Sequence, residues 1–211
     1  MDERLYIVND IETAGHRVGG HAVLSWGACV VTREALTPAE RRERGLTFYV
    51  ELKPISREIE LEAIRVGCVG LHCLRLYKGD PRYDPSSTSF DPRLVFDALE
   101  RDGLWISEAV ERFLSWLERV REGKKVVGVF DTVLFDPAFI QLLFMHGSIA
   151  SPYGHHGMDL DALHKGFARN MGAKLRDLGV PDTRETAHCA DDDAMYLADI
   201  ARVLIYERIG A

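Results

Sequence analysis

The chain has 211 residues, of which 46% are hydrophobic and 28% charged, and its formal net charge is −7. These values are typical of a globular protein with one hydrophobic core, and the negative charge argues against a broad basic surface for duplex nucleic acid. No run approaches the roughly 20 apolar residues that a membrane span needs. The first residues do not combine a basic segment with an apolar one, so we expect no secretion signal and a cytoplasmic location.

The first half of the sequence predicts three short strands, at residues 5–8, 22–31 and 46–52. A polar excursion over residues 33–44 separates the second strand from the third. Three strands in quick succession with short connections are typical of an antiparallel meander.

An irregular insert is expected next. Residues 56–66 can form a helix with Ser56 as its N-cap. Beyond it, Asp-Pro pairs and a serine-rich tract interrupt the pattern. We therefore expect a single domain over residues 1–211, with an irregular insert at about residues 67–105 that lies over its functional face.

The second half alternates between helical and strand patterns. Residues 107–120 show apolar side chains at helical spacing after Ser107, and residues 124–130 form a β-branched run. Further helices are expected at residues 137–145, 160–169 and 188–209. This order predicts an α/β fold in which helices pack on a mixed sheet, with the three-strand antiparallel meander joined to parallel strands.

Three segments carry candidate chemistry. Asp10-Ile11-Glu12 follows the first strand, and residues i and i+2 of an extended segment point to the same side. Two carboxylates held together in this way are unfavourable unless a cation neutralises them. An acidic pair at a strand end also arises by chance, so this segment alone does not establish a metal site.

Asp136 and the acidic segment at residues 188–193 are also ambiguous when each is taken alone. Asp136 precedes Pro137, which is a common arrangement for a helix N-cap. His188 comes shortly before three consecutive aspartates, and the helix dipole favours acidic residues in a first turn. The dipole accounts for one or two aspartates but not for three with a histidine.

Together, the three segments resemble the three motifs of the DEDDh 3′–5′ exonuclease superfamily, which includes polymerase proofreading subunits, ribonuclease T and oligoribonuclease. Its first motif resembles Asp10-Ile11-Glu12-Thr13-Ala14-Gly15, its second Phe135-Asp136 with Phe139, and its third His188 with Asp193 and Ala194. The resemblance spans roughly residues 4–205. Two positions depart from the family pattern: Thr132 stands where many members have asparagine, and Ser25 where many have glutamate.

The resemblance implies a ribonuclease-H-like fold with helices on both faces of the sheet. It also implies two divalent cations, Mg²⁺ or Mn²⁺, held by Asp10, Glu12, Asp136 and Asp193. His188 is then the general base, a role that suits an imidazole because it titrates near neutral pH.

The implied reaction is hydrolysis of phosphodiester bonds from the 3′ end of single-stranded RNA or DNA, with release of nucleoside 5′-monophosphates. Thr13, Ala14 and Gly15 are expected to line the pocket for the 3′-terminal nucleotide. The compact build resembles ribonuclease T and oligoribonuclease, which favours RNA or short oligonucleotides. Relatives are often homodimers, and this leaves a homodimer open. Two alternatives stay open: a catalytically inactive member that binds or scaffolds nucleic acid, and a different two-metal phosphoesterase of the same fold, such as an endonuclease.

Other polar clusters invite simpler interpretations. We interpret Asp191 and Asp192 as helix-terminus charges and His155-His156 as part of a mobile loop. A locally basic stretch could contact a phosphate backbone or be a solvated helix face; it consists of Lys165, Arg169, Lys174 and Arg176. The tryptophans are expected in the core, and these are Trp26, Trp105 and Trp116. The cysteines show no Cys-x-x-Cys spacing and are interpreted as reduced apolar side chains; they are Cys29, Cys68, Cys73 and Cys189.

Overall fold

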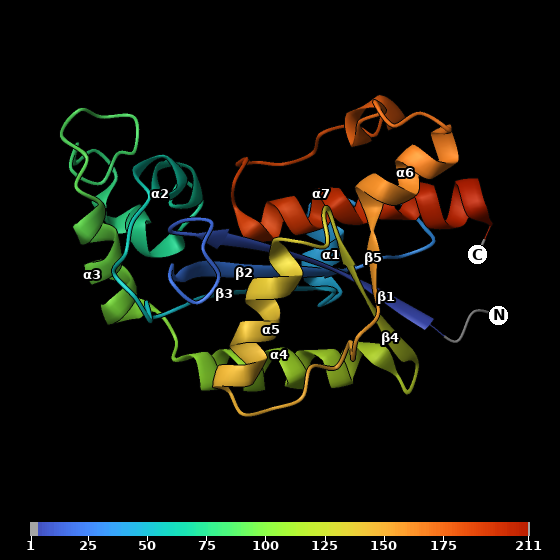
Figure 1. The fold of residues 1–211 in the computed structure, drawn as a ribbon, viewed down its shortest axis with the longest axis horizontal. Coiled ribbons are helices and arrows are strands. Elements are labelled where there is room, and N and C mark those ends of the chain that lie inside the picture. Colours follow the sequence, from blue (N-terminus) through green and yellow to red (C-terminus); the bar gives the residue numbers. More distant parts are fainter. Residues whose placement is uncertain (1–3, 211) are drawn as a thin grey trace.

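The computed structural model describes residues 4–210, which form a five-stranded sheet with helices on both of its faces (Figure 1). The strands are β1 (Arg4–Thr13), β2 (Val23–Val30), β3 (Thr47–Glu51), β4 (Lys125–Phe130) and β5 (Gly157–Asp159). The helical segments are α1 (Pro38–Glu43), α2 (Leu61–Gly67), η1 (His72–Tyr77), α3 (Pro92–Asp102), α4 (Ile106–Arg121), α5 (Asp136–His146), α6 (Leu160–Ala168), η2 (Leu175–Leu178), α7 (Ala190–Arg202) and η3 (Val203–Ile209).

The sheet has the order β3-β2-β1-β4-β5. β1 pairs antiparallel with β2, and β2 with β3, whereas β4 runs parallel to both β1 and β5. This confirms the expected mixed sheet with an antiparallel meander. β5 was not expected, because a three-residue strand carries almost no periodic signal in the sequence.

Alternate residues of β1 pack on opposite faces of the sheet. Leu5 and Ile7 belong to the apolar cluster beneath α4 and α5, and Tyr6 and Val8 belong to the cluster beneath α7. Such alternation is expected of a strand buried on both sides. The side chains of even-numbered residues in β1, including Asp10, therefore lie on the α7 face.

An aromatic cluster fills the core between the sheet and α4. The ring of Trp26 on β2 stacks on Phe113 of α4 with the ring centroids 4.3 Å apart. Trp116 is also buried, and its indole N–H donates to the carbonyl oxygen of Gly45 at 2.9 Å. The core assignment was wrong for Trp105, which is 60% exposed and lies 5.3 Å below the ammonium group of Lys53. Trp105 immediately precedes α4, where the chain turns along the surface.

The insert is more regular than expected, because residues 92–102 form helix α3. The Asp91-Pro92 pair that was interpreted as an interruption is the start of this helix. The carboxylate of Asp91 accepts a hydrogen bond from the backbone N–H of Arg93, and Pro92 occupies the first turn, where its missing N–H costs nothing. Figure 1 shows the insert at the end of the sheet opposite the two labelled termini.

The insert has an apolar cluster of its own. Phe96 and Leu99 of α3 pack with Ile64 of α2 and with Leu24 of β2. This packing fixes α2 and the turn after it beside the end of β1, whose Thr13 contributes backbone to the same region.

Three helix boundaries differ from the sequence expectation. α2 begins at Leu61 instead of Ser56, α4 is capped at Trp105 instead of Ser107, and α7 begins at Ala190 with His188 outside it. Over residues 4–210, no helix combines the length and the apolar character required to cross a bilayer.

Candidate active site

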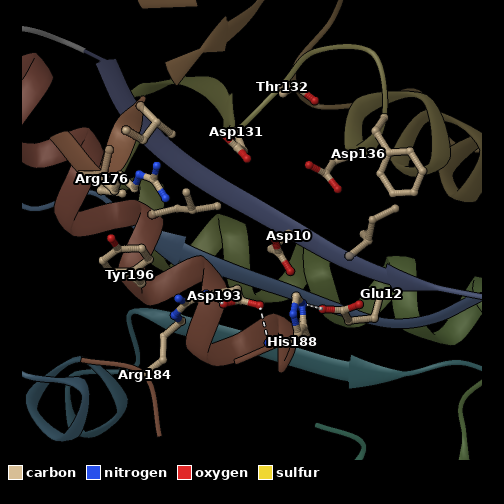
Figure 2. Close-up of a pocket in the computed structure, with 15 residues that line it drawn as sticks. Asp10, Glu12, Asp131, Thr132, Asp136, Arg176, Arg184, His188, Asp193 and Tyr196 are labelled. Atoms are coloured by element: carbon tan, nitrogen blue, oxygen red, sulfur yellow. Dashed lines mark hydrogen bonds and ion pairs between the residues drawn. The ribbon is translucent and has the colours of Figure 1, made fainter. Parts of the chain in front are cut away.

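A cleft of about 560 Å³ lies between β1, the β4–α5 connection and α7. Its lining includes all five side chains that the sequence singled out for catalysis, and these are Asp10, Glu12, Asp136, His188 and Asp193. Figure 2 shows Asp10 near the middle of this group, with Glu12 and Asp136 on one side and Asp193 on the other. Residues more than 180 positions apart in the sequence therefore meet in one cavity.

Asp10 and Glu12 project toward α7 because they continue the even-numbered face of β1. In the sheet, Asp10 pairs with Gly27 of β2. A Cβ atom on Gly27 would lie 2.0 Å from the carbonyl oxygen of Ala190, so only glycine lets the first turn of α7 rest on the sheet here. This close approach brings Asp193 to the carboxylates of β1.

Asp136 reaches the cleft through the parallel pairing of β1 and β4. Val8 pairs with Val129, so the two strands end at the same edge of the sheet. The chain leaves β4 at Phe130, forms a short connection and enters α5 at Asp136. Asp136 is buried in the first turn of the helix, and Phe135 is the capping residue. The structure therefore does not use Asp136 as an N-cap.

His188 has a left-handed backbone conformation, with φ of +62°. Its backbone N–H donates to Oδ2 of Asp193 at 2.9 Å, which holds that carboxylate in place. The imidazole is 54% exposed, and its Nδ1 lies 4.0 Å from Oε1 of Glu12. Residues with positive φ outside glycine are uncommon and concentrate at functional sites.

A second glycine allows the His188 turn to approach the insert. A Cβ atom on Gly70 would lie 2.4 Å from Cα of Cys189 and 2.8 Å from the carbonyl oxygen of His188. The thiol of Cys189 donates to the carbonyl oxygen of Gly70. The insert thus fixes the segment that carries His188, a role that the sequence did not indicate.

The electrostatics of the cleft are unfavourable for its carboxylates. Burial, followed by repulsion from Asp193 and Asp136, raises the pKa of Glu12 to about 9. Burial and repulsion from Asp131 raise the pKa of Asp136 to about 7. Burial first, and then the neighbouring acids, raise the pKa of Asp10 well above its ordinary value. Carboxyl groups resist ionisation in this way where like charges crowd together without a cation.

The residues of the cleft fit a divalent cation. Oδ2 of Asp10 is shielded from solvent and has no hydrogen-bond partner among the described residues. Glu12, His188 and Asp193 each offer a ligand atom within 4.8 Å of the others. Carboxylate oxygens are the ligands that Mg²⁺ and Mn²⁺ prefer, and a bound cation would satisfy the orphaned oxygen and offset the repulsion.

The neighbouring aspartates of α7 have a different environment. Asp191 and Asp192 are buried in the first turn and both bind the guanidinium of Arg42 on α1. The distances are 3.0 Å to Asp191 and 2.8 Å to Asp192, and the other oxygen of Asp192 accepts the N–H of Thr186 at 2.9 Å. These two residues are helix-terminus charges, as expected, but their main partner is an arginine distant in sequence.

The residues predicted to bind the 3′-terminal nucleotide lie just beyond Glu12 and outside the lining of the cleft. Thr13 and Ala14 are buried, and the N–H of Ala14 donates to the carbonyl oxygen of Ala22. A Cβ atom on Gly15 would lie 2.4 Å from the ring of His21. Their contact with substrate stays a prediction.

Sequence reasoning did not identify Arg184. Its guanidinium binds Asp182 through Nε and Nη2 and donates from Nη1 to Oδ1 of Asp193 at 2.6 Å. It also lies 4.7 Å over the ring of Tyr196. The segment that carries Arg184 has no regular secondary structure, and nothing in its sequence predicts which carboxylate of α7 it meets.

No family model matches the chain, and comparisons with known proteins find similarity to nucleases. The 3′-5′ DNA exonuclease Cap18 of Escherichia coli is 25% identical over 209 residues, which cover 96% of this chain and 92% of that protein. Among solved structures, the nuclease domain of 3′hExo, a DEDDh family member bound to rAMP, has a TM-score of 0.66 at 13% identity and covers 98% of this chain and 94% of its own.

Two further structures share the fold. Cell-death related nuclease 4 (CRN-4) has a TM-score of 0.65 at 16% identity over 98% of this chain and 66% of its own. Exonuclease I of E. coli in complex with a dT13 oligonucleotide has a TM-score of 0.56 at 13% identity over 97% of this chain and 41% of its own. The relative that spans nearly the whole chain, the ribonuclease-H-like fold and the meeting of the motif residues in one cleft together support assignment of this chain to the DEDDh 3′–5′ exonuclease superfamily.

Proposed function

We propose that this protein is a metal-dependent exonuclease that shortens single-stranded nucleic acid from its 3′ end and releases nucleoside 5′-monophosphates. The observation that carries the proposal is the group of buried carboxylates of Asp10, Glu12 and Asp136, which have no lysine or arginine partner among residues 4–210 and share one open cleft with His188. Maintaining such repulsion is costly for a fold unless a cation is to be bound.

The residues of the chain then take distinct roles. Asp10, Glu12, Asp136 and Asp193 would hold two divalent cations, which supply a water of lowered pKa and neutralise charge on the phosphate. The exposed imidazole of His188 accepts the proton of the attacking water. The water oxygen bonds to the phosphorus of the terminal nucleotide and the bond from phosphorus to O3′ of the preceding nucleotide breaks. The departing O3′ takes up a proton from solvent, so the preceding nucleotide ends in a free 3′-hydroxyl and the released one keeps its 5′-phosphate.

Glu12 and the backbone of His188 support this arrangement. Nδ1 of His188 lies 4.0 Å from Oε1 of Glu12, so the imidazole stands beside one of the carboxylates of the cleft. The N–H of His188 holds Asp193. His188, the proposed base, and Asp193, a proposed cation ligand, are therefore joined directly by a hydrogen bond.

The proposal is tested with matched 5′-labelled single-stranded DNA and RNA oligonucleotides and Mg²⁺ or Mn²⁺. The wild-type protein is expected to produce a ladder of single-nucleotide steps that disappears with a chelator. Asp10→Asn should reduce the rate by about 10³-fold or more, because several kcal/mol of transition-state stabilisation are lost. Asp97→Asn removes an exposed carboxylate that pairs with Arg57 and serves as the control.

Either of two outcomes would contradict the proposal. One is full activity of the Asp10→Asn protein, and the other is a pattern of internal cuts in place of a ladder. Binding of the oligonucleotide without any cleavage under both metals would favour the catalytically inactive alternative.

A further inference from the structure

The cleft contains two arginines whose environments differ. Arg184 is tied to Asp182 on one side and to Asp193 on the other, with 25% of its side chain exposed. Arg176, on η2, also lines the cleft, is exposed, and forms no ion pair or hydrogen bond through its side chain with any residue in 4–210. Arg176 is thus a cation of the cleft that the protein itself does not neutralise.

The position of Arg176 relative to the carboxylates defines a direction. α7 passes from Asp193 to Tyr196 and Ile200 along the cleft, and Arg176 lies beside this later part of the helix. Figure 2 shows Arg176 and Glu12 at opposite ends of the group, with Asp10 and Asp193 between them. A ligand that spans the cleft would therefore meet the carboxylates first and Arg176 beyond them.

We propose that Arg176 binds a backbone phosphate on the 5′ side of the bond to be cut. The inference rests on the proposed function and on the prediction that residues 13–15, just beyond Glu12, receive the 3′-terminal nucleotide, which would place its phosphate over Asp10 and Asp193. The strand then leaves the cleft past η2, where its next phosphates meet the guanidinium. An arginine is suited to this contact because its planar fork matches two phosphate oxygens.

The ion pairs of Arg184 with Asp182 and Asp193 favour Arg176 as the arginine that binds the phosphate. Asp182 accepts from Nε at 2.8 Å and from Nη2 at 2.6 Å, so the guanidinium of Arg184 is held at two points before it meets Asp193. Breaking these bonds to reach a phosphate would leave Asp193 and Asp182 without their cation. Arg176 has no such contacts to lose, and an unpaired cation is also the better attractor for a polyanion in a protein of net charge −7.

Two substrates distinguish a contact of Arg176 with a backbone phosphate from a role of Arg176 in the cleavage step. One is a single-stranded oligonucleotide, and the other is thymidine 5′-monophosphate p-nitrophenyl ester, which has the reacting phosphate but none on the 5′ side of it. For Arg176→Gln we expect kcat/KM on the oligonucleotide to fall roughly 10-fold, mainly through KM, because one charged hydrogen-bonded contact is lost. The same variant should hydrolyse the ester at the wild-type rate.

Binding provides a second and independent measurement. Anisotropy of a labelled oligonucleotide, measured in the Asp10→Asn background so that the strand stays intact, gives the dependence of Kd on salt. Loss of one phosphate contact should reduce the slope of log Kd against log salt by about 0.7. Arg112→Gln is the matched control, since Arg112 is an exposed arginine on α4 and does not line the cleft.

Each outcome has a defined meaning. An equal loss on the ester and the oligonucleotide would place Arg176 at the reacting phosphate or in the fold and overturn the inference. An unchanged salt slope, or the same change in Arg112→Gln, would overturn it as well. If the wild-type protein cleaves neither substrate, the proposed function fails instead, and the two failures are therefore distinguishable.

Discussion

Two groups of carboxylates meet at the first turn of α7 and differ in how their charge is balanced. Asp191 and Asp192 face α1, where Arg42 binds both of them. Asp193 faces the cleft, with Asp10 and Glu12, where Arg184 is the sole arginine that contacts a carboxylate of this set within residues 4–210. The first group is bound by an arginine, although Oδ1 of Asp191 has no hydrogen-bond partner among the described residues, and Asp10 and Glu12 of the second group have no arginine or lysine partner there.

This difference in charge balance indicates which of the two groups would bind a metal cation. The three aspartates follow one another at the start of one helix, yet Asp191 and Asp192 share Arg42, whereas Asp193 is bound by Arg184 and by the backbone N–H of His188. Changes in the cleft should therefore affect turnover more than stability, and changes at Arg42 should do the reverse. The following tests address this contrast.

The largest expected effect comes from His188→Asn. Asparagine tolerates the positive φ and retains the backbone N–H that holds Asp193, so the variant removes the imidazole alone. We expect kcat on a single-stranded oligonucleotide to fall about 10²- to 10⁴-fold, as for loss of a general base, with an unchanged urea midpoint. His146→Asn, at the end of α5, is the control. A variant with wild-type turnover would remove His188 from the chemistry.

A smaller effect, on stability, is expected from Arg42→Gln. The change leaves two buried carboxylates without their cation, and we expect the free energy of unfolding to fall by about 1–3 kcal/mol, because Arg42 is partly exposed. Arg44→Gln breaks an exposed pair with Glu34 and should cost less than about 1 kcal/mol. Urea denaturation measures both. If the Arg42→Gln protein is folded at the assay temperature and its turnover is nevertheless suppressed, the Asp191–Asp192 group and the carboxylates of the cleft do not act independently.

A third effect, spread over several pH units, is the pH dependence of the stability of the metal-free protein. Because the pKa of Glu12 is raised to about 9, the folded chain holds a proton that the unfolded chain releases above its ordinary pKa of 4.5. Stability is therefore highest below pH 4.5 as far as this group is concerned, and it declines as the pH rises toward 9. The slope reaches at most about 1.4 kcal/mol per pH unit for each such carboxyl group. Asp136, with its pKa raised to about 7, adds to the decline over a narrower range.

Urea denaturation with a chelator between pH 5 and pH 8 measures this slope. Glu12→Gln should flatten it, and Mn²⁺ should do so in the wild-type protein, because a bound cation favours the ionised carboxylates. A stability that rises with pH over this range, after chelation, would show that these carboxylates are already balanced by charge within the protein.

The sequence predicted those parts of the site that depend on local geometry. Asp10 and Glu12 share a face because of the two-residue period of a strand, and this holds wherever the strand is placed. The fold class followed from the order of the strand and helix patterns. Helix α3 was missed because Asp91-Pro92 begins a helix as readily as it interrupts one, and only the packing of Phe96 and Leu99 decides between the two.

Contacts between distant segments could not be predicted in this way. The pairing of Arg42 with Asp191 joins residues 149 positions apart, and the approach of Gly70 to His188 depends on how the insert packs. The exposure of Trp105 likewise follows from where the insert ends and not from the residue's own preference. Such contacts are tertiary, and the sequence alone offers each of these residues many other possible partners.

The contact between Gly27 and Ala190 has a consequence for motion. Since the first turn of α7 rests directly on β2, the wall of the cleft that carries Asp10 and Asp193 behaves as one stiff body. Any adjustment of the cleft to oligonucleotides of different width or base sequence must come from the opposite walls, which are formed by residues 131–135 and 169–188. We expect hydrogen exchange to be slow in β1 and α7 and to respond to an oligonucleotide chiefly in those two connections.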